Sequence, residues 1–124
     1  MGTGFKGGAS YHHTISENLT SLKKSYVFTD GYFGDKGEGR SFTRNIASEN
    51  PSETAKDFFD KAAYGGLVQH MSNGKGKLVK MKDGSIVSHR EISTSDGSPA
   101  VEINITRSEG SGGIKKQKIH FVKE

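Results

Sequence analysis

Two stretches near the end of the sequence alternate apolar and polar residues with a period of two. The apolar members are Val101, Ile103, Ile105, Ile119 and Phe121. The polar members are Glu102, Asn104, Thr106, Lys116, Lys118 and His120. Successive side chains of a strand point to opposite faces, so each stretch predicts a strand with one apolar and one polar face. The apolar faces must be covered by other elements, which leaves the polar faces open.

A further strand signal is the Asp83-Gly84 pair, which lies between two apolar-rich runs, residues 78–82 and 85–92. Asp-Gly is a strong signal for a two-residue type I′ turn, in which both turn residues have positive φ. Such a turn would join the two runs into a hairpin and would pair Leu78 with His89. The turn therefore predicts the register of the hairpin.

The same register predicts which side chains of this hairpin face solvent. If the hairpin follows the orientation of the other two strands, His89 and Glu91 join the polar face. Arg90 would then point inward, unless the strand bulges before Ser93. The side on which Arg90 lies stays open at this point.

The clearest helix signal is Asn50-Pro51-Ser52-Glu53, in which an Asn cap, Pro at the first position and Glu at the third share one register. We expect a helix from Pro51 to about Tyr64, ended by Gly65-Gly66. Its buried face should consist of Ala55, Phe58, Phe59 and Ala62.

An earlier helix is predicted by Thr14-Ile15-Ser16-Glu17, which fits the capping box. Leu19, Leu22 and Tyr26 follow at helical spacing and form a narrow apolar stripe. Farther along, Asp30-Gly31 is expected to interrupt regular structure.

Residues 26–28 and 40–46 predict two more short strands. A chain of 124 residues is expected to form one domain, residues 1–124. The glycine-rich residues 1–11 should be mobile or lie along the surface. The predicted fold class is α+β: two N-terminal helices packed on one face of an antiparallel sheet of four or more strands.

Composition limits the possible functions. The chain has 18 Lys and Arg against 14 Asp and Glu, a formal net charge of +4, which favours partners such as nucleic acid or an acidic protein. It has no cysteine, which excludes disulfides, thiolate zinc sites and Cys nucleophiles. No apolar run approaches the roughly 20 residues that a membrane helix needs.

The predicted polar face holds the groups that a metal-independent ribonuclease requires. Such an enzyme needs a base for the 2′-hydroxyl, an acid for the leaving 5′-oxygen and cations for the phosphorane. Histidine suits both proton transfers near neutral pH, and His89 and His120 are the natural pair. The catalytic candidates are His89, Arg90, Thr94, Lys116, Lys118 and His120. The substrate-binding candidates are Ser93, Ser95, Glu102, Asn104 and Thr106.

Other functions remain open beside this one. A solvated polar face belongs to every half-buried sheet and needs no catalytic role. A metal-dependent nuclease needs clustered carboxylates, whereas Asp83, Glu91, Asp96 and Glu102 are scattered, so we expect no bound metal or other cofactor.

Aromatic residues add a second alternative. Tyr32, Phe33 and Phe42 would suit base stacking in a non-catalytic RNA-binding module, although aromatics in a glycine-rich loop more often pin the loop to the core. A protein-interaction module whose basic face meets an acidic partner is the remaining alternative.

The second half of the chain, from about Tyr64 onward, resembles the C-terminal toxin domains of bacterial contact-dependent inhibition and related polymorphic toxin systems. The resemblance rests on three segments, which read NGKGK (73–77), DGSIVSHREISTSDGSPAVEINI (83–105) and KKQKIHF (115–121). By position, it implies site residues at His89, Arg90, Ser93, Thr94, Lys116, Lys118 and His120.

The resemblance also implies a biological setting. It implies a nuclease domain delivered from a secreted or cell-surface parent protein that cleaves RNA, commonly tRNA, in the cytoplasm of a target bacterium. It further implies a cognate acidic immunity protein and, in some members, translation elongation factor Tu as an activator. The fold that it implies is related to barnase and the colicin tRNases.

Overall fold

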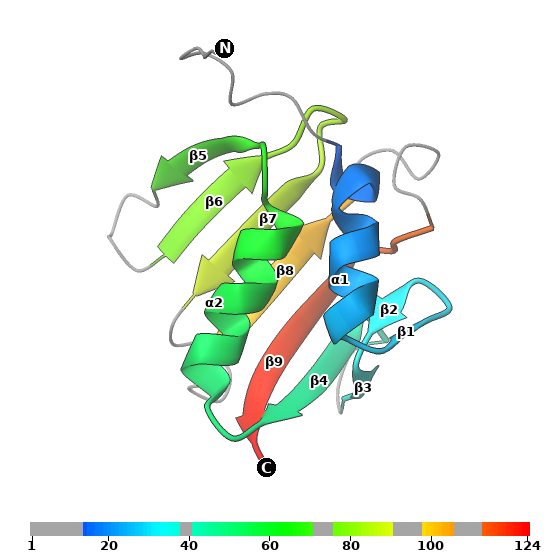
Figure 1. Cartoon of the computed structure of the whole chain (residues 1–124), viewed down its shortest axis with the longest axis vertical. Helices are drawn as coiled ribbons and strands as arrows, with labels where there is room; N and C mark the ends of the chain where they lie inside the picture. The colour runs from blue at the N-terminus through cyan, green and yellow to red at the C-terminus, as the bar shows by residue number, and fades with distance from the viewer. Residues whose placement is uncertain (1–13, 38–40, 71–75, 91–97, 106–112) are drawn as a thin grey trace.

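The computed structural model describes residues 14–37, 41–70, 76–90, 98–105 and 113–124, so the expectation for residues 1–11 lies outside the described part. A seven-stranded sheet carries two α-helices on one face (Figure 1). The helices are α1 (Leu19–Ser25) and α2 (Pro51–Ala62). The strands of this sheet, in spatial order, are β3 (Asp35–Lys36), β4 (Thr43–Ser48), β9 (Gln117–Lys123), β8 (Ala100–Asn104), β7 (Ile86–Arg90), β6 (Gly76–Lys80) and β5 (Leu67–His70). A separate two-stranded sheet pairs β1 (Phe28–Thr29) with β2 (Tyr32–Phe33).

The mixed helix and sheet content agrees with the predicted class, but the sheet is not wholly antiparallel. The helices also differ from the two N-terminal helices predicted, because a 3₁₀-helix precedes α1 and α2 follows β1 to β4 in the chain. β5 to β9 form a meander in which each strand pairs antiparallel with the next. β4 joins the far side of β9 and runs parallel to it, with Asn45 beside His120. Parallel neighbours need a long connection, and here it contains α2 and the meander up to β9. Alternation within one strand carries no information about its neighbour, which is why the prediction missed this pair.

Both helix starts are formed as predicted by local hydrogen bonds. Thr14 and Glu17 complete the capping box, and the side chain of Asn50 accepts a bond of 3.3 Å from the backbone N–H of Glu53. The first turn is a 3₁₀-helix, Ile15–Asn18, and only then does α1 begin. α2 ends at Ala62, before the predicted end at Tyr64, and Gly65 follows with a φ of +80°.

The core lies between α2 and the sheet. α2 buries the four predicted residues Ala55, Phe58, Phe59 and Ala62 and contacts β4, β7, β8 and β9. α1 packs against α2, and its Leu22 is fully buried in the core. The ring of Phe58 lies at the centre, 5.0 Å from Tyr26, 5.2 Å from Phe33 and 5.7 Å from Phe121 between ring centroids.

The β6–β7 hairpin differs from its predicted register by one residue. Val79 pairs with Val87, and Leu78 with Ser88 instead of His89. The backbone N–H of Met81 donates to the carbonyl of Ser85, so the loop has three residues, Lys82 to Gly84. Gly84 alone in this loop has a positive φ, +90°, which fits a type I turn followed by a glycine bulge. A slip of one residue reverses the two faces of β7 relative to β6.

Asp30-Gly31 forms the two-residue turn that was predicted for Asp83-Gly84. Asp30 and Gly31, at φ +55° and +92°, are the two turn residues between β1 and β2. Their positive φ values are those of a type I′ turn, so Asp30-Gly31 joins two strands where only an interruption was predicted.

Candidate functional site

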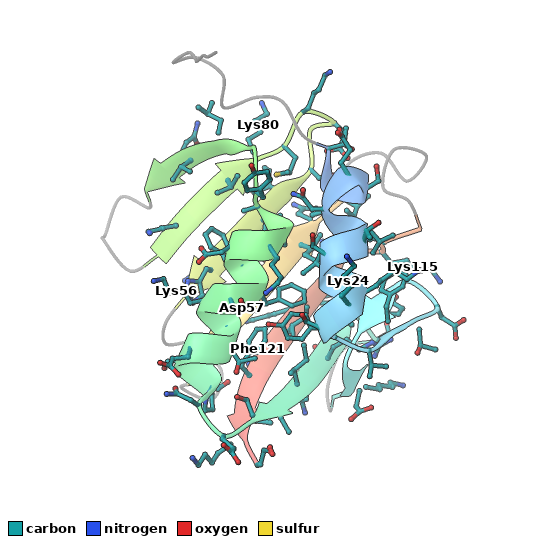
Figure 2. The ribbon with its side chains drawn as sticks, in the orientation of Figure 1. Lys24, Lys56, Asp57, Lys80, Lys115 and Phe121 are labelled. Carbon is teal, nitrogen blue, oxygen red and sulfur yellow. The ribbon has the colours of Figure 1, made fainter. Side chains whose placement is uncertain are left out.

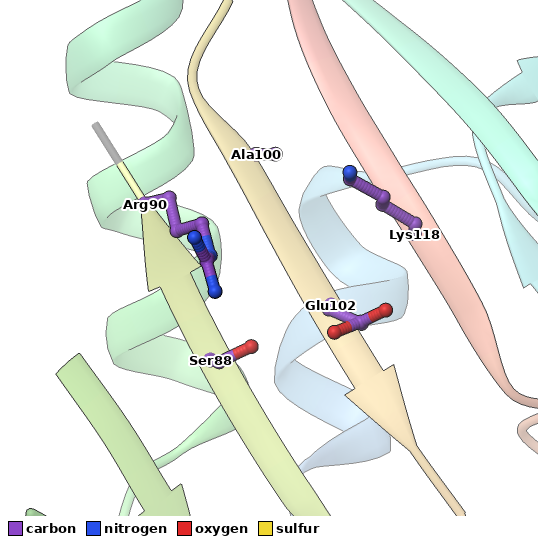
Figure 3. A pocket seen from close by; sticks show the side chains of 5 residues that line it. All are labelled: Ser88, Arg90, Ala100, Glu102 and Lys118. Carbon is purple, nitrogen blue, oxygen red and sulfur yellow. The ribbon is translucent and has the colours of Figure 1, made fainter. Parts of the chain in front are cut away.

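A small hollow lies on the sheet face that the helices leave uncovered. Its volume is about 150 Å³, and it is lined by Ser88, Arg90, Ala100, Glu102 and Lys118. Figure 3 shows these side chains in front of β7, β8 and β9, with both helices behind the strands. The hollow therefore lies on the predicted polar face.

The register of three neighbouring strands brings these residues together. Arg90 is the partner of Ala100, and Ser88 is the partner of Glu102. Glu102 is in turn the partner of Lys118 on β9. Cross-strand partners share a face, so a row of polar side chains crosses the sheet at this level.

Arg90 faces the hollow, and His89 does not, which corrects the predicted orientation of β7. Val87, two residues earlier on the same face as His89, is fully buried against the helix layer. The ring of His89 packs on Phe59 of α2, with 5.4 Å between ring centroids. His89 is therefore on the opposite side of the sheet from His120, and the predicted two-histidine pair is wrong. The cause is the one-residue slip at the three-residue loop.

His120 lies beside the hollow on the open face. It is the cross-strand partner of Ala100, which lines the hollow. Its Nδ1 is 3.0 Å from the hydroxyl of Ser98, a hydrogen bond that orients the ring. The side chain is only 6% exposed. Glu102 is its diagonal neighbour on β8, so their Cα atoms are roughly 7–8 Å apart.

Two cations and one carboxylate line the hollow. Within the described ranges, no ion pair of 4.0 Å or less joins Arg90, Glu102 or Lys118 to any partner. Arg90 and Lys118 are partly buried, where attraction to an anion is stronger than in bulk water. The arrangement can hold a phosphate between the cations, with a carboxylate and an imidazole nearby for proton transfer.

The other predicted site residues are distributed more widely. Lys116 is exposed just before β9, and its Nζ lies 5.6 Å from the ring centroid of Phe42. Asn104 is exposed at the end of β8, opposite Ile86. The remaining candidates, Ser93, Thr94, Ser95 and Thr106, lie outside the described residues.

Several residues on this face were missed from the sequence. Ser88 lines the hollow, but the predicted register had placed it opposite Val79. A three-residue loop at Lys82 to Gly84 would have placed it correctly. Thr43 and Asn45 of β4 flank Lys118 and His120, and no signal within one strand identifies a parallel neighbour.

No group of three or more His, Asp or Glu side chains suited to a metal ion occurs among the residues described. Within the same residues, no helix is long and apolar enough to cross a membrane. Comparison of the chain with protein-family models, with curated proteins and with solved structures finds no match.

Proposed function

We propose that this chain is an endoribonuclease that cleaves RNA without a metal ion and that the hollow on the open sheet face is its catalytic centre. One observation supports this proposal above all: Arg90, Glu102 and Lys118 line one small hollow without pairing with one another, and His120 is next to it. The basic net charge of +4 supports a polyanionic substrate.

The proposed reaction is transfer of the phosphate to the neighbouring 2′-oxygen. Glu102 removes the proton of the 2′-hydroxyl, and the 2′-oxygen attacks phosphorus. The bond from phosphorus to the 5′-oxygen breaks, and His120 donates a proton to that oxygen. The products are a 2′,3′-cyclic phosphate and a free 5′-hydroxyl. The diagonal placement of Glu102 and His120 suits an acid and a base that act on opposite sides of one phosphate.

The two cations have a separate task in this proposal. Arg90 and Lys118 stabilise the additional negative charge on the phosphorane, and Ser88 donates a hydrogen bond to a non-bridging oxygen. Each hydrogen bond to a charged group is worth about 1.5–3 kcal/mol when it forms. An arginine can bind two phosphate oxygens at once, so a lysine at position 90 would replace it poorly.

The test is incubation of the protein with total tRNA in EDTA, followed by analysis of the fragment ends. We expect cleavage that leaves cyclic phosphates and that persists in EDTA. RNA that stays intact, also after addition of bacterial lysate as a source of activators, would refute the proposal. RNA that is bound but not cut would instead favour the non-catalytic RNA-binding module.

The resemblance to contact-dependent toxin domains supports a more specific setting. In this setting the substrate is tRNA in the cytoplasm of a target bacterium, and the domain arrives as part of a secreted or cell-surface parent protein. A cognate acidic immunity protein would cover the basic open face, and elongation factor Tu would be a candidate activator. Induced expression in bacteria should arrest growth, and a small acidic reading frame beside the gene should relieve the arrest.

A further inference from the structure

A cluster of aromatic rings and cations lies where the β1–β2 hairpin meets β4 and the residues before β9. The guanidinium carbon of Arg44 lies 3.8 Å from the ring centroid of Tyr32, and Nζ of Lys115 lies 5.5 Å from the same centroid. Lys116 lies over Phe42 beside them, at 5.6 Å. We call this set the basic-aromatic patch; its members are Tyr32, Phe42, Arg44, Lys115 and Lys116.

Buried hydrogen bonds hold this patch in one geometry. The side chain of Gln117 is fully buried, and its Oε1 accepts a bond of 2.8 Å from the N–H of Phe33. Its Nε2 donates to the carbonyls of Gly31 and Lys115, at 2.9 and 2.8 Å. Backbone on both sides of Tyr32 is thus tied to the start of β9. A ligand of the patch would meet a preorganised surface, which lowers the entropic cost of binding.

The cations of the patch keep their charge available. In the part of the chain that the structure describes, no carboxylate lies within 4.0 Å of Arg44, Lys115 or Lys116. Lys115 and Lys116 are exposed, and Arg44 and Tyr32 are partly exposed. A patch that only clamped the hairpin to the sheet would not need three cations that, among the described residues, have no carboxylate beside them.

We propose that the basic-aromatic patch binds a single-stranded stretch of RNA outside the hollow. An unpaired base extends the stack of Tyr32 and Arg44, because guanidinium planes stack on bases as aromatic rings do. Lys115 and Lys116 contact the adjoining phosphates. Arg44 shares the helix side of the sheet with its partner Ile119, whereas Lys118 faces the hollow on the other side. The RNA therefore passes around the start of β9 between the patch and the hollow. The inference rests on the proposed function for the identity of the ligand.

Stacking is what separates RNA from an acidic protein at this patch. A chain of carboxylates needs positive charge and N–H donors, and arginine can bind one carboxylate through two of them. A base needs the planar guanidinium in addition. The substitution Arg44→Lys keeps the charge and removes the plane, whereas Arg44→Ala removes both.

The experiment measures binding of a fluorescent 12-nucleotide 2′-O-methyl RNA of mixed sequence by anisotropy, at several salt concentrations. This RNA has no free 2′-hydroxyl and so cannot be cleaved by the proposed reaction. A trinucleotide of the same chemistry serves as a ligand that fills the hollow alone. Lys56→Ala, on α2 and well away from Lys115 in Figure 2, removes one exposed lysine outside the patch as a matched control.

We expect Arg44→Lys to weaken binding of the 12-mer about 5-fold or more, which is the loss of one stacked base, with an unchanged salt dependence. Arg44→Ala should also reduce the slope of log K against log salt by about 0.7. The trinucleotide should bind both variants as it binds the native chain, and Lys56→Ala should bind the 12-mer normally.

Two results would overturn the inference. One is native binding of the 12-mer by Arg44→Lys, since this would show that charge alone acts at the patch. The other is that Arg44→Lys weakens binding of a 12-residue polyglutamate peptide as much as it weakens binding of the 12-mer RNA. That result would assign the patch to an acidic protein. Thermal unfolding of each variant confirms that it is folded. Failure of the proposed function has a different signature, because unmodified tRNA would then stay intact while the 12-mer still bound.

Discussion

Glu102 and His120 occupy diagonal positions on neighbouring strands, and the proposed reaction assigns one proton transfer to each. Removing either group should lower the rate of RNA cleavage by about 10² to 10⁴, the usual contribution of a positioned acid or base. We therefore expect Glu102→Gln and His120→Gln each to lower kcat by at least about 100-fold, with little change in KM. Single-turnover cleavage of tRNA measures this effect.

The control for this prediction is the histidine on the other side of the sheet. His89 packs on Phe59 and lies away from the hollow, so His89→Gln should keep its kcat within a few-fold of the native value. Equal losses in His89→Gln and His120→Gln would show that the two histidines act together after all.

A second residue-level feature is the bond between Tyr26 and Asp57. The Tyr26 hydroxyl donates to Oδ2 of Asp57 at 2.5 Å, and Lys61 forms an ion pair with Oδ1 at 2.6 Å. The bonds from Lys61 and then from Tyr26 lower the pKa of Asp57. Burial first, and then the bond to Asp57, raises the pKa of Tyr26.

These two pKa shifts predict how stability depends on pH. The lowered pKa of Asp57 gives stability that is present above about pH 4, its unfolded value, and is lost as pH falls through the folded value. The raised pKa of Tyr26 gives stability that is present below about pH 10 and is lost at higher pH. Tyr26→Phe should lower the free energy of unfolding by about 1 kcal/mol at pH 7, since both groups are partly exposed. Urea unfolding between pH 3 and pH 11 tests this expectation, and a constant difference between the two proteins across that range would contradict it.

At the level of the elements, the three-residue loop between β6 and β7 sets which side of β7 faces the hollow. Gly84 has a φ of +90° there, and the N–H of Ser85 is bound by the side chain of Asp83 at 2.9 Å. A side chain at position 84 would strain the loop. The loop thus accommodates the register in which Val87 is buried against the helix layer.

We expect Gly84→Ala to lower the free energy of unfolding by about 1 kcal/mol or more, because alanine adopts this φ at a cost. Lys82→Ala, at an exposed position of the same loop, should change it by less than about 0.5 kcal/mol. Chemical denaturation of both variants gives the comparison. If alanine at position 84 is tolerated as well as alanine at position 82, the glycine does not fix the turn.

For the whole molecule, Phe58 is the side chain on which the layers depend. Its ring contacts Tyr26 after α1, Phe33 of β2 and Phe121 of β9, and it is fully buried. A single ring thus joins both helices, the small hairpin and the main sheet. Removing this ring would weaken the packing of each of these elements.

Phe58→Ala should cost about 3–5 kcal/mol, a large part of the roughly 5–15 kcal/mol by which domains of this kind are stable. The proposed RNA cleavage should be lost through unfolding, although Phe58 lies on the helix side of the sheet and the hollow on the other, and it should return in part at low temperature. Phe58→Leu should cost less, since it leaves a smaller cavity. Circular dichroism melting curves beside activity measurements separate this effect from a direct effect on catalysis.

What the sequence determined by itself is local. The caps at Thr14 and Asn50 form because their partners, Glu17 and Glu53, are three residues away. The buried faces of α2, β8 and β9 follow from periods of 3.6 and 2, which are visible within each segment. Lys118, Glu102 and His120 were therefore placed on the open face correctly.

Tertiary structure decided the remainder, because it depends on contacts between residues far apart in the chain. The two Asp-Gly pairs have the same sequence, yet only Asp30-Gly31 forms a two-residue turn, and Asp83-Gly84 belongs to a longer loop. Val87 is buried against the helix layer, and this position requires the longer loop. His89 then faces the helices, and Arg90 faces the hollow. The parallel pairing of β4 with β9 likewise arises between distant segments. The alternation within each strand predicted a polar face, but packing on the opposite side of the sheet decided which residues lie on that face.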